Sequence, residues 1–420
     1  MKKVLIITYA WPPKGGVGVM RVLKFAKYLP QFGWMPSIIT TDENAPGSPY
    51  RGEDIGINLA AYRVIRTRYK SLFLKLPDRL RKVILMPDIH RGWFDSAYET
   101  AVSLLKEEKF DAIFSTSPPE ISHLIARALK KRFGIPWIAD LRDLWSDDHF
   151  ERESFLRHGP SLKMEKEVLN DADSIVTVSK PWADKLAKTS GVTKINVITN
   201  GFDEEDFHDI PLRHSQQFTM AYTGKLHEEM QDPEMFFKTL SDCIQEGLIE
   251  KSGIDIKFYT IGFRKARIKE LAKKYFLDDV VDEYPAVQYK ESLRIQREST
   301  LLLFFQWKGE RGWYSAKLFE YIGSGKPIFA VSERDSVSGN LIKELNAGFV
   351  STCSKELKQL LLACYKCYRE KGYVSLETSK EKIQLYTRKN LTRLLANILD
   401  GLVVPRDTKA EGRPVPFIKK

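Results

Sequence analysis

The stretch GWYSAKLFEYIGSGKPIFAV at residues 312–331 predicts a helix followed by a buried strand. The helix begins near Ser315, and the segment G-K-P ends it just before an apolar run that starts at residue 327. Lys317 and Glu320 are three residues apart and therefore share one face of the first turns. The sequence places a cation and a carboxylate beside the start of a helix.

This arrangement suits a nucleoside diphosphate. Backbone N–H groups near Ser315 and Ala316 can hold a diphosphate, because the N-terminus of a helix carries partial positive charge. Lys317 can neutralise the phosphates, and Glu320 can accept hydrogen bonds from both hydroxyls of a ribose. The alternative interpretation is a surface Lys–Glu pair, which is common on helices at this spacing.

A second loop, YTGKLHEEMQDPE at 222–234, follows another apolar run. Gly224 allows a sharp turn there. Lys225, directly after it, can add a second positive charge from the facing loop.

Short apolar runs alternate with amphipathic stretches of helix length throughout most of the chain, as in parallel sheets covered on both faces. The expected strands are 4–9, 36–41, 62–67, 111–116, 136–141, 174–179, 195–199, 218–223, 254–261, 280–284, 300–305, 327–332 and 348–352. A chain of 420 residues exceeds what one core usually organises. We therefore expect an α/β protein with two Rossmann-like, doubly wound domains and a cleft between them.

The domain boundary is expected in the polar stretch DEEDFHDIPLRHSQQ, near 204–216. The predicted parts are a first domain over 1–204, a second domain over 205–380, a last amphipathic helix over 381–400 and a flexible tail over 401–420.

The first strand leads into WPPKGGVGVMR, where Gly15, Gly16 and Gly18 let the backbone turn and approach a ligand before a helix begins. The pattern is neither G-x-G-x-x-G nor a Walker A motif, which argues against a dinucleotide or ATP. A plain strand-to-helix turn is the alternative.

Further along the first half, His123 lies in a predicted helix, and Asp140, Arg142 and Asp143 follow a predicted strand. Side chains at that strand end belong to the expected cleft. The aspartate–arginine set either fixes the loop as an ion pair or binds sugar hydroxyls and phosphate. A single helical histidine is more often structural than functional.

Charge is unevenly spread over the chain, whose formal net charge is +11. Residues 63–91 hold nine Lys or Arg against two Asp, interleaved with apolar residues. This pattern predicts a basic amphipathic surface for anionic lipid or a phosphate-rich acceptor, or else a solvated basic face. No zinc-finger, RNP or helix-turn-helix signature supports nucleic acid as a partner.

Other classes are disfavoured by the sequence. The four cysteines are too few and too unevenly placed for a disulfide framework, which fits a reducing cytoplasm. No apolar stretch reaches the roughly 20 residues that span a bilayer. We expect a cytoplasmic protein, with peripheral contact to the inner face of the membrane through 63–91.

The segments KLFEYIGSGKPI, GIPWIADLRDLW, VSKPWADKL, VITNGFD and the GGVG loop together resemble glycosyltransferase family 4, in the order that the family has them. The closest resemblance is to a branch of bacterial surface-polysaccharide enzymes similar to N-acetylfucosaminyltransferases. It runs from about Lys2 to Asp400. The resemblance implies a GT-B fold with an N-terminal acceptor domain, a C-terminal nucleotide-sugar domain and a final helix that crosses back.

By position, the resemblance implies that the backbone at Gly16 approaches the donor diphosphate and sugar, and that His123 lies at the reaction centre. Lys225 matches the family's basic residue after Y-x-G, and Glu320 matches the carboxylate that holds the ribose.

The chain departs from the family pattern at two positions. The first glutamate of the family's E-x7-E would stand at position 312, where this chain has Gly312, with Glu310 two residues earlier. A second basic residue is replaced by Gln231, which leaves Lys225 and Lys317 as the expected diphosphate partners. The first departure leaves open which group orients the transferred sugar.

The resulting expectation is a retaining glycosyltransferase that uses a UDP- or GDP-linked sugar and needs neither a metal nor another cofactor. A polyprenyl-diphosphate-linked or other saccharide is the expected acceptor, and nucleic acid is not expected to bind. Two alternatives stay open: a nucleotide-sugar epimerase of GT-B fold, and a basic membrane- or nucleic-acid-binding protein with an inert transferase fold.

Overall fold

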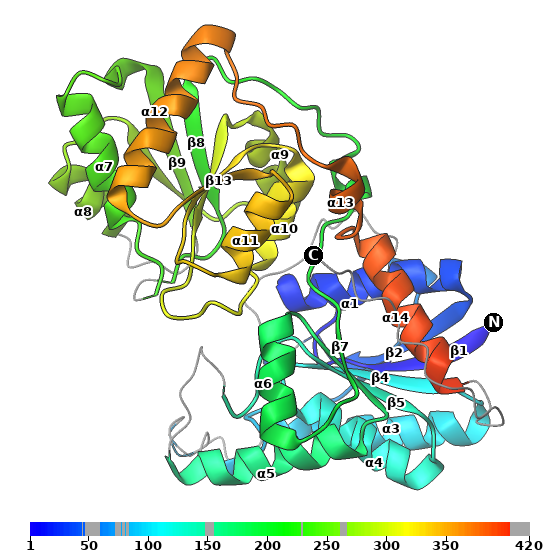
Figure 1. The fold of residues 1–420 in the computed structure, drawn as a ribbon. Coiled ribbons are helices and arrows are strands. Elements are labelled where there is room, and N and C mark those ends of the chain that lie inside the picture. The colour runs from blue at the N-terminus through cyan, green and yellow to red at the C-terminus, as the bar shows by residue number, and fades with distance from the viewer. Residues whose placement is uncertain are drawn as a thin grey trace.

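The computed structural model describes residues 1–43, 45–46, 59–71, 77, 80, 84–147, 155–227, 230–260 and 267–403. They form two α/β domains that Figure 1 shows side by side, with the last helices running back from the second domain to the first. No helix in the described part of the chain is both long enough and apolar enough to cross a membrane.

The first domain is built on a parallel sheet of order β3-β2-β1-β4-β5-β6-β7. Its strands are β1 (Lys2–Ile7), β2 (Trp34–Thr41), β3 (Arg63–Thr67), β4 (Ala112–Ser117), β5 (Trp137–Leu141), β6 (Ser174–Thr177) and β7 (Ile195–Val197). Its helices are α1 (Val17–Tyr28), α3 (Phe94–Glu107), α4 (Ile121–Phe133), α5 (Phe155–Asp171) and α6 (Lys180–Ser190). The register pairs Val4 with Pro36 on one side and with Ala112 on the other.

The second domain has a parallel sheet of order β10-β9-β8-β11-β12-β13. Its strands are β8 (Phe218–Thr223), β9 (Ile254–Thr260), β10 (Val281–Pro285), β11 (Leu301–Phe305), β12 (Ile328–Val331) and β13 (Gly348–Ser351). Its helices are α7 (Glu234–Gln245), α8 (Arg267–Lys274), α9 (Tyr289–Glu298), α10 (Ala316–Ser324), α11 (Val337–Glu344) and α12 (Ser354–Lys371).

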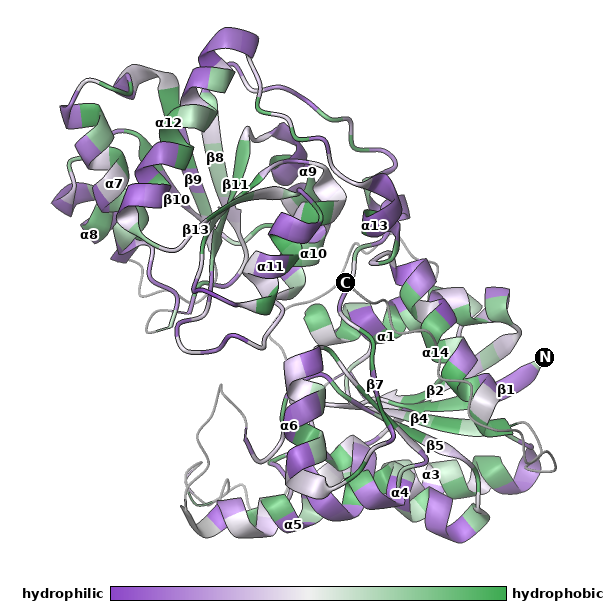
Figure 2. Cartoon of the chain, viewed as in Figure 1, coloured by the Kyte–Doolittle hydropathy of each residue, from purple (hydrophilic) through white to green (hydrophobic). Residues whose placement is uncertain are grey.

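The strands are apolar because helices cover both faces of each sheet, so side chains on either side of a strand are buried. In the first domain, one core lies between the sheet and α3 to α6, and another lies between the sheet, α1 and the last helix. Figure 2 shows the apolar strands inside and polar residues on the outer helix faces. The thirteen predicted strands and the two doubly wound sheets are confirmed.

The last helix is interrupted, which differs from the single helix expected over 381–400. The chain forms α13 (Lys380–Gln384), leaves the helical path, and then forms α14 (Arg388–Val403), which packs on α1 of the first domain. The break has a local cause: Phe202 N–H donates to the Tyr386 carbonyl, and Arg388 N–H donates to the Phe202 carbonyl. Backbone pairing with Phe202 replaces helical hydrogen bonds at this point.

The ends of that region also differ from expectation. Residues 401–403 belong to α14 and not to a tail. The rest of the expected tail, 404–420, lies outside the described residues. So do parts of the basic segment 63–91, namely 72–76, 78–79 and 81–83.

Candidate functional site

The start of α10 lies near the carboxyl ends of β8 and β11, the point where the strand order of the second sheet reverses. Ser315 is the residue before the helix, has an extended backbone, and makes no hydrogen bond that caps the helix. The first N–H groups of a helix have no partner within the helix. They are therefore available to an anion at this edge of the sheet.

Lys317 lies over the end of β8. Its Nζ donates a hydrogen bond of 3.1 Å to the Lys225 carbonyl and lies 3.6 Å from the centre of the Tyr222 ring. Gly224 has a φ of 104°, and a Cβ at this position would lie 3.4 Å from Lys317 Cε. Glycine at 224 therefore permits both the turn and the close approach of the lysine.

Glu320 lies one turn further along α10 and faces α9. Burial raises the pKa of its carboxyl to about 7, although Arg388, Lys317 and a hydrogen bond from Gln296 act in the opposite direction. Burial also holds the pKa of Lys317 well below its usual value. Lys317 and Glu320 do not form an ion pair with each other, since Lys317 binds the Lys225 carbonyl instead. The surface-pair interpretation of these two residues is therefore wrong.

The loop after β8 brings two further groups to the same place. Lys225 contributes its carbonyl to Lys317, while its own side chain is exposed. Burial lowers the pKa of His227 to about 4, and the charges of Lys225 and Lys317 lower it further. His227 is therefore neutral at physiological pH and adds no positive charge to this place.

Gln231, which replaces a basic residue of the family pattern, has a structural role. Its Oε1 accepts the His227 N–H at 3.0 Å, and its Nε2 donates to the Phe305 carbonyl at 2.7 Å. The side chain is buried. It ties the loop after β8 to β11.

The glycine loop of the first domain leads from β1 into α1. Gly16 precedes α1 with a φ of 110°, a value that favours glycine. Because glycine has no side chain, no side-chain hydrogen bond caps the start of α1. Gly16 is exposed, and Gly15 beside it is half-buried. Gly18 has a different reason to be glycine: a Cβ there would lie only 1.8 Å from the Arg142 guanidinium. Arg142 thus covers the first turn of α1.

Asp140 pairs with a residue that the sequence analysis did not consider. Both oxygens of its buried carboxylate accept hydrogen bonds from Arg21 on α1, at 2.8 and 3.1 Å, and Thr116 donates to it as well. Arg21 also donates to the carbonyls of Ile198 and Thr199. Of the two roles expected for Asp140, this geometry fits the fixing of loops.

Arg142 and Asp143 are half-buried and lie just beyond β5. Arg142 donates to Thr116 Oγ1 at 3.0 Å and to the Pro118 carbonyl at 2.6 Å. Burial raises the pKa of Asp143, and the neighbouring charge of Arg142 partly offsets that effect. Arg142 therefore joins the loop after β4 to the start of α1.

His123 is buried on α4, and its Nδ1 lies 2.7 Å from Ser115 Oγ. Trp137 Nε1 donates to the same Ser115 oxygen at 2.8 Å, which leaves the serine proton for His123. Burial lowers the pKa of the imidazole to about 3, so it is neutral. This network favours a proton on Nε2, an atom that has no hydrogen-bond partner among the described residues.

The two domains touch where the loop before α10 meets α6. A Cβ on Gly312 would lie 3.0 Å from Pro181 Cβ and 3.2 Å from Trp182 Cδ1. Trp313 packs against the core of the first domain that contains Trp182. The side of the second domain that carries Lys317 thus faces the first domain.

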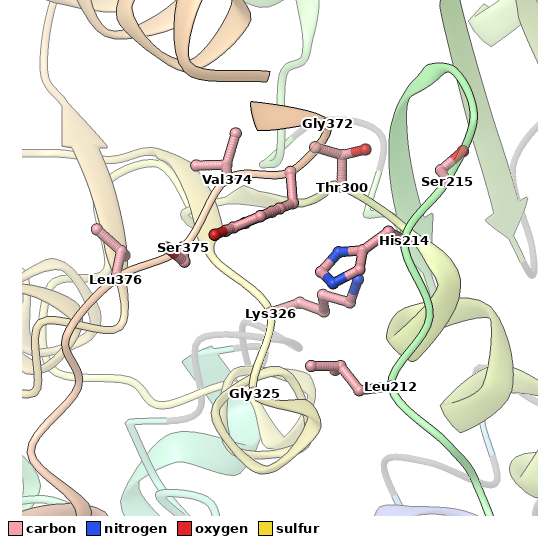
Figure 3. A pocket seen from close by; sticks show the side chains of 11 residues that line it. Leu212, His214, Ser215, Thr300, Gly325, Lys326, Gly372, Val374, Ser375 and Leu376 are labelled. Carbon is pink, nitrogen blue, oxygen red and sulfur yellow. The ribbon is translucent and has the colours of Figure 1, made fainter. Parts of the chain in front are cut away.

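A separate cavity of about 130 Å³ lies at the opposite edge of the second sheet. Its lining includes Thr300 and Lys326, which precede β11 and β12, and residues of both connections between the domains. Figure 3 shows His214 and Lys326 next to each other in it. Since Lys317 and Glu320 lie at the carboxyl ends of the strands, this cavity does not belong to their site. Within the described ranges, no cluster of His, Cys, Asp or Glu is arranged to hold a metal ion.

Three groups at the site were not identified from the sequence as its members: the Tyr222 ring under Lys317, Gln296 beside Glu320, and Arg388 behind it. Tyr222 is part of the quoted Y-x-G segment, so its position near the end of β8 was a usable signal. No local pattern indicates Gln296 or Arg388, because each reaches Glu320 from a different helix.

The chain is similar to known glycosyltransferase domains and structures. Residues 15–201 match the family model described as "Glycosyl transferase 4-like domain". No curated protein sequence matches the chain.

Solved structures match almost the whole chain. Sucrose-phosphate synthase from Thermosynechococcus elongatus has a TM-score of 0.65 at 14% identity, with 96% of this chain and 99% of that chain covered. Anabaena HepE in complex with UDP and glucose has the same score and identity, with 96% and 100% covered. The lipopolysaccharide outer core galactosyltransferase WaaB has a TM-score of 0.58 at 11% identity, with 96% and 99% covered.

At these identities the structural similarity establishes the fold, and the family match covers the glycine loop, His123 and Asp140. The chain therefore has the GT-B fold of glycosyltransferases, and residues 15–201 of its first domain match the glycosyl transferase 4-like family model.

Proposed function

We propose that this protein is a retaining glycosyltransferase that moves a sugar from a nucleotide donor to a saccharide acceptor. The observation that carries the proposal is the uncapped start of α10, with Lys317 held over Gly224 and a half-buried Glu320 on the next turn. A helix N-terminus and an ammonium group bind a diphosphate, and a carboxylate binds the two hydroxyls of a ribose.

The diphosphate binds between the first N–H groups of α10, Lys317 and Lys225. Lys317 is costly to keep charged in the free protein, since burial lowers its pKa. A bound diphosphate restores a favourable environment for that charge. UDP or GDP is the nucleotide, and the complex of HepE with UDP and glucose is consistent with UDP.

The transfer step breaks the bond between the anomeric carbon and the diphosphate oxygen. Negative charge grows on the departing phosphate, where Lys317, Lys225 and the start of α10 stabilise it more strongly than in the ground state. The acceptor hydroxyl oxygen bonds to the anomeric carbon on the same face, and its proton passes to the departing phosphate. The anomeric configuration is therefore retained. On the side of the first domain, the proposal assigns the reaction centre to His123, whose buried Nε2 has no partner among the described residues, and the donor contact to the loop at Gly15, Gly16 and Gly18.

The reaction proceeds without a metal ion in this proposal, because the two lysines and the helix N-terminus supply the positive charge that a cation would otherwise provide. Turnover should persist in EDTA at a concentration well above that of any contaminating metal. Complete loss in EDTA, with recovery on addition of Mg²⁺ or Mn²⁺, would show that a cation is required.

The proposed acceptor is a lipid-linked saccharide at the inner face of the cytoplasmic membrane, in the synthesis of a surface polysaccharide. The basic segment 63–91 supports a peripheral membrane contact, and its described residues Leu80 and Ile84 are half-exposed. A lipopolysaccharide galactosyltransferase among the similar structures is consistent with such an acceptor. The motif order favours the branch similar to N-acetylfucosaminyltransferases.

The first test is thermal unfolding of the wild type and Glu320→Ala with UDP, GDP, dTDP and their sugars. A ligand that binds only the folded state raises the melting temperature with its concentration. We expect one nucleotide to stabilise the wild type and the control Glu370→Ala, whose carboxylate is exposed on α12. Glu320→Ala should lose most of that shift. An absence of any shift in the wild type would contradict the proposal.

A further inference from the structure

The cavity at the amino ends of the strands of the second sheet lies between that domain and the two segments that connect the domains. One wall consists of residues from the two connections, within 212–215 and 372–376. The other contains Thr300, just before β11, and Gly325 and Lys326, just before β12. A water molecule takes up about 30 Å³ in the liquid, so a cavity of about 130 Å³ has room for an ion the size of phosphate.

The two connections touch each other at this cavity. The ring centres of His214, on the first connection, and Tyr373, on the second, lie 4.9 Å apart. Tyr368, near the end of α12, also donates a hydrogen bond of 3.2 Å to the Ser215 carbonyl. Figure 3 shows the His214 ring next to Lys326. A ligand in the cavity therefore contacts the second domain and both connections at once.

Lys326 is a buried cation in this cavity, with 7% of its surface exposed. Its Nζ donates a hydrogen bond of 2.5 Å to the Arg213 carbonyl, and it forms no ion pair with another described residue. Burial lowers the pKa of Lys326 to about 8, although the charge of Glu298 acts in the opposite direction. The ammonium group is therefore still charged at neutral pH. It has three N–H groups, of which one is bonded to a described residue.

Several other side chains of the lining can donate hydrogen bonds. The His214 ring and the hydroxyls of Tyr373 and Ser375 make no hydrogen bond to another described residue. No aspartate or glutamate belongs to the described residues that line the cavity. A buried ammonium group with N–H and O–H donors around it, and no carboxylate, favours an anion. Because the donors come from three segments, a tetrahedral ion with four oxygens fits them better than a carboxylate with two.

We propose that this cavity binds inorganic phosphate, held by Lys326 and by donors from the two connections. The anion supplies the opposite charge that the buried Lys326 ammonium lacks, and hydrogen bonds between charged groups are strong. This site is separate from that of the nucleotide, since Lys317 and Glu320 lie at the other ends of the strands. A bound phosphate also ties both connections to the second domain. Any relative movement of the two domains passes through these connections.

The test is thermal unfolding of the full chain in sodium phosphate, compared with sodium acetate and sodium chloride at equal ionic strength. Phosphate should raise the melting temperature with its concentration, and more than either other salt does. Part of that rise can come from exclusion of phosphate from the protein surface, which stabilises any folded protein. The variants separate the two causes. Lys326→Met and His214→Ala should each lose most of the difference between phosphate and acetate.

Two control variants should keep that difference. Lys366→Met removes an exposed lysine of α12, and Lys317→Met removes the lysine of the nucleotide site. Hydrogen exchange locates the ligand on the wild type. Phosphate should slow amide exchange within 208–217 and 372–379, and should do so less in His214→Ala.

An equal rise in phosphate and acetate would overturn phosphate as the ligand. A rise that survives in both Lys326→Met and His214→Ala, or slower exchange confined to the start of α10, would overturn the site. So would an equal loss in Lys366→Met. Should Lys326→Met fail to fold, His214→Ala still decides, because the His214 side chain is exposed. These results do not depend on nucleotide binding, so the proposed function is tested separately.

Discussion

Helices α1 and α10 each begin after a strand that borders the point where the strand order of its sheet reverses, β1 for α1 and β11 for α10. Their surroundings differ in charge pairing. Around α1, Arg21 binds Asp140 at 2.8 Å and Lys24 binds Asp203 at 2.7 Å, all of them buried. At α10, the Lys317 ammonium contacts a carbonyl and the Tyr222 ring but no carboxylate, and the pKa of Glu320 is raised by burial.

This difference separates charges that hold the fold from charges that serve a ligand. A buried ion pair whose hydrogen bonds are all made is already compensated and does not require a ligand. A buried charge without an opposite partner is unfavourable and becomes favourable only when a ligand supplies one. By that criterion, the start of the first helix is a structural junction and the start of the second is the proposed binding site.

The largest effect should come from breaking the junction at α1. Arg21→Met leaves the Asp140 carboxylate buried without its cation, which should lower the free energy of unfolding by about 3–5 kcal/mol. Urea unfolding measures it. The control Lys180→Met removes an exposed ion pair with Asp184 and should change stability by less than about 1 kcal/mol. A comparable loss in both variants would contradict the distinction.

The second variant should lower kcat without lowering the free energy of unfolding. Lys317→Met removes a charge that stabilises the departing phosphate, so kcat should fall about 10²–10³-fold. The free energy of unfolding should not decrease, because burial disfavours the charged lysine in the free protein. Turnover assays and urea unfolding of the same preparation measure the two quantities. A variant that unfolds easily yet keeps its kcat would assign Lys317 to the fold.

A third effect tests the contact between the domains. Gly312→Glu places a side chain against Pro181 and Trp182 and should cost about 1–3 kcal/mol of stability. Gly159→Glu is the control, because that glycine has open space where a Cβ would be. Thermal unfolding of both variants decides the matter. An unchanged melting temperature for Gly312→Glu would show that the contact is easily displaced.

The smallest effect is on pH dependence. Ribose hydroxyls favour the ionised form of Glu320, whose pKa is raised to about 7 in the free protein. Nucleotide affinity should therefore rise from pH 6 to pH 8, by at most about tenfold per pH unit. Lys317 acts in the opposite direction, since a diphosphate favours its ammonium form and its pKa is lowered. In Glu320→Gln, the remaining dependence should reverse, with affinity falling as pH rises.

In the absence of a ligand, the raised pKa of Glu320 makes the stability of the folded protein depend on pH. Its value in the unfolded chain is 4.5, so the folded state holds the proton more tightly between pH 4.5 and about 7. The free energy of unfolding should fall as pH rises through that window, because ionisation of the buried carboxyl is unfavourable. Glu320→Gln should remove this decrease in urea unfolding curves measured at pH 5 and pH 8.

The sequence predicted the strands well, because strands depend on short-range patterns. The sequence patterns also located the strand end before Gly224 and the helix start beside Lys317 and Glu320. Long-range pairings were not predictable. Asp140 was grouped with Arg142, two residues away, whereas its partner Arg21 is 119 residues distant. The break between α13 and α14 likewise depends on Phe202, far along the chain.

The backbone pairing of Phe202 with Tyr386 and Arg388 joins the two chain crossings between the domains. On its other side, the Phe202 ring fills the space beside Gly323 of α10, where a Cβ would lie only 2.5 Å from it. Helix α10 therefore cannot tilt without moving this ring and the crossings attached to it. The helix that carries Lys317 and Glu320 is thus mechanically coupled to the crossings between the domains. A movement at those crossings would also move the end of α10 that contacts Phe202.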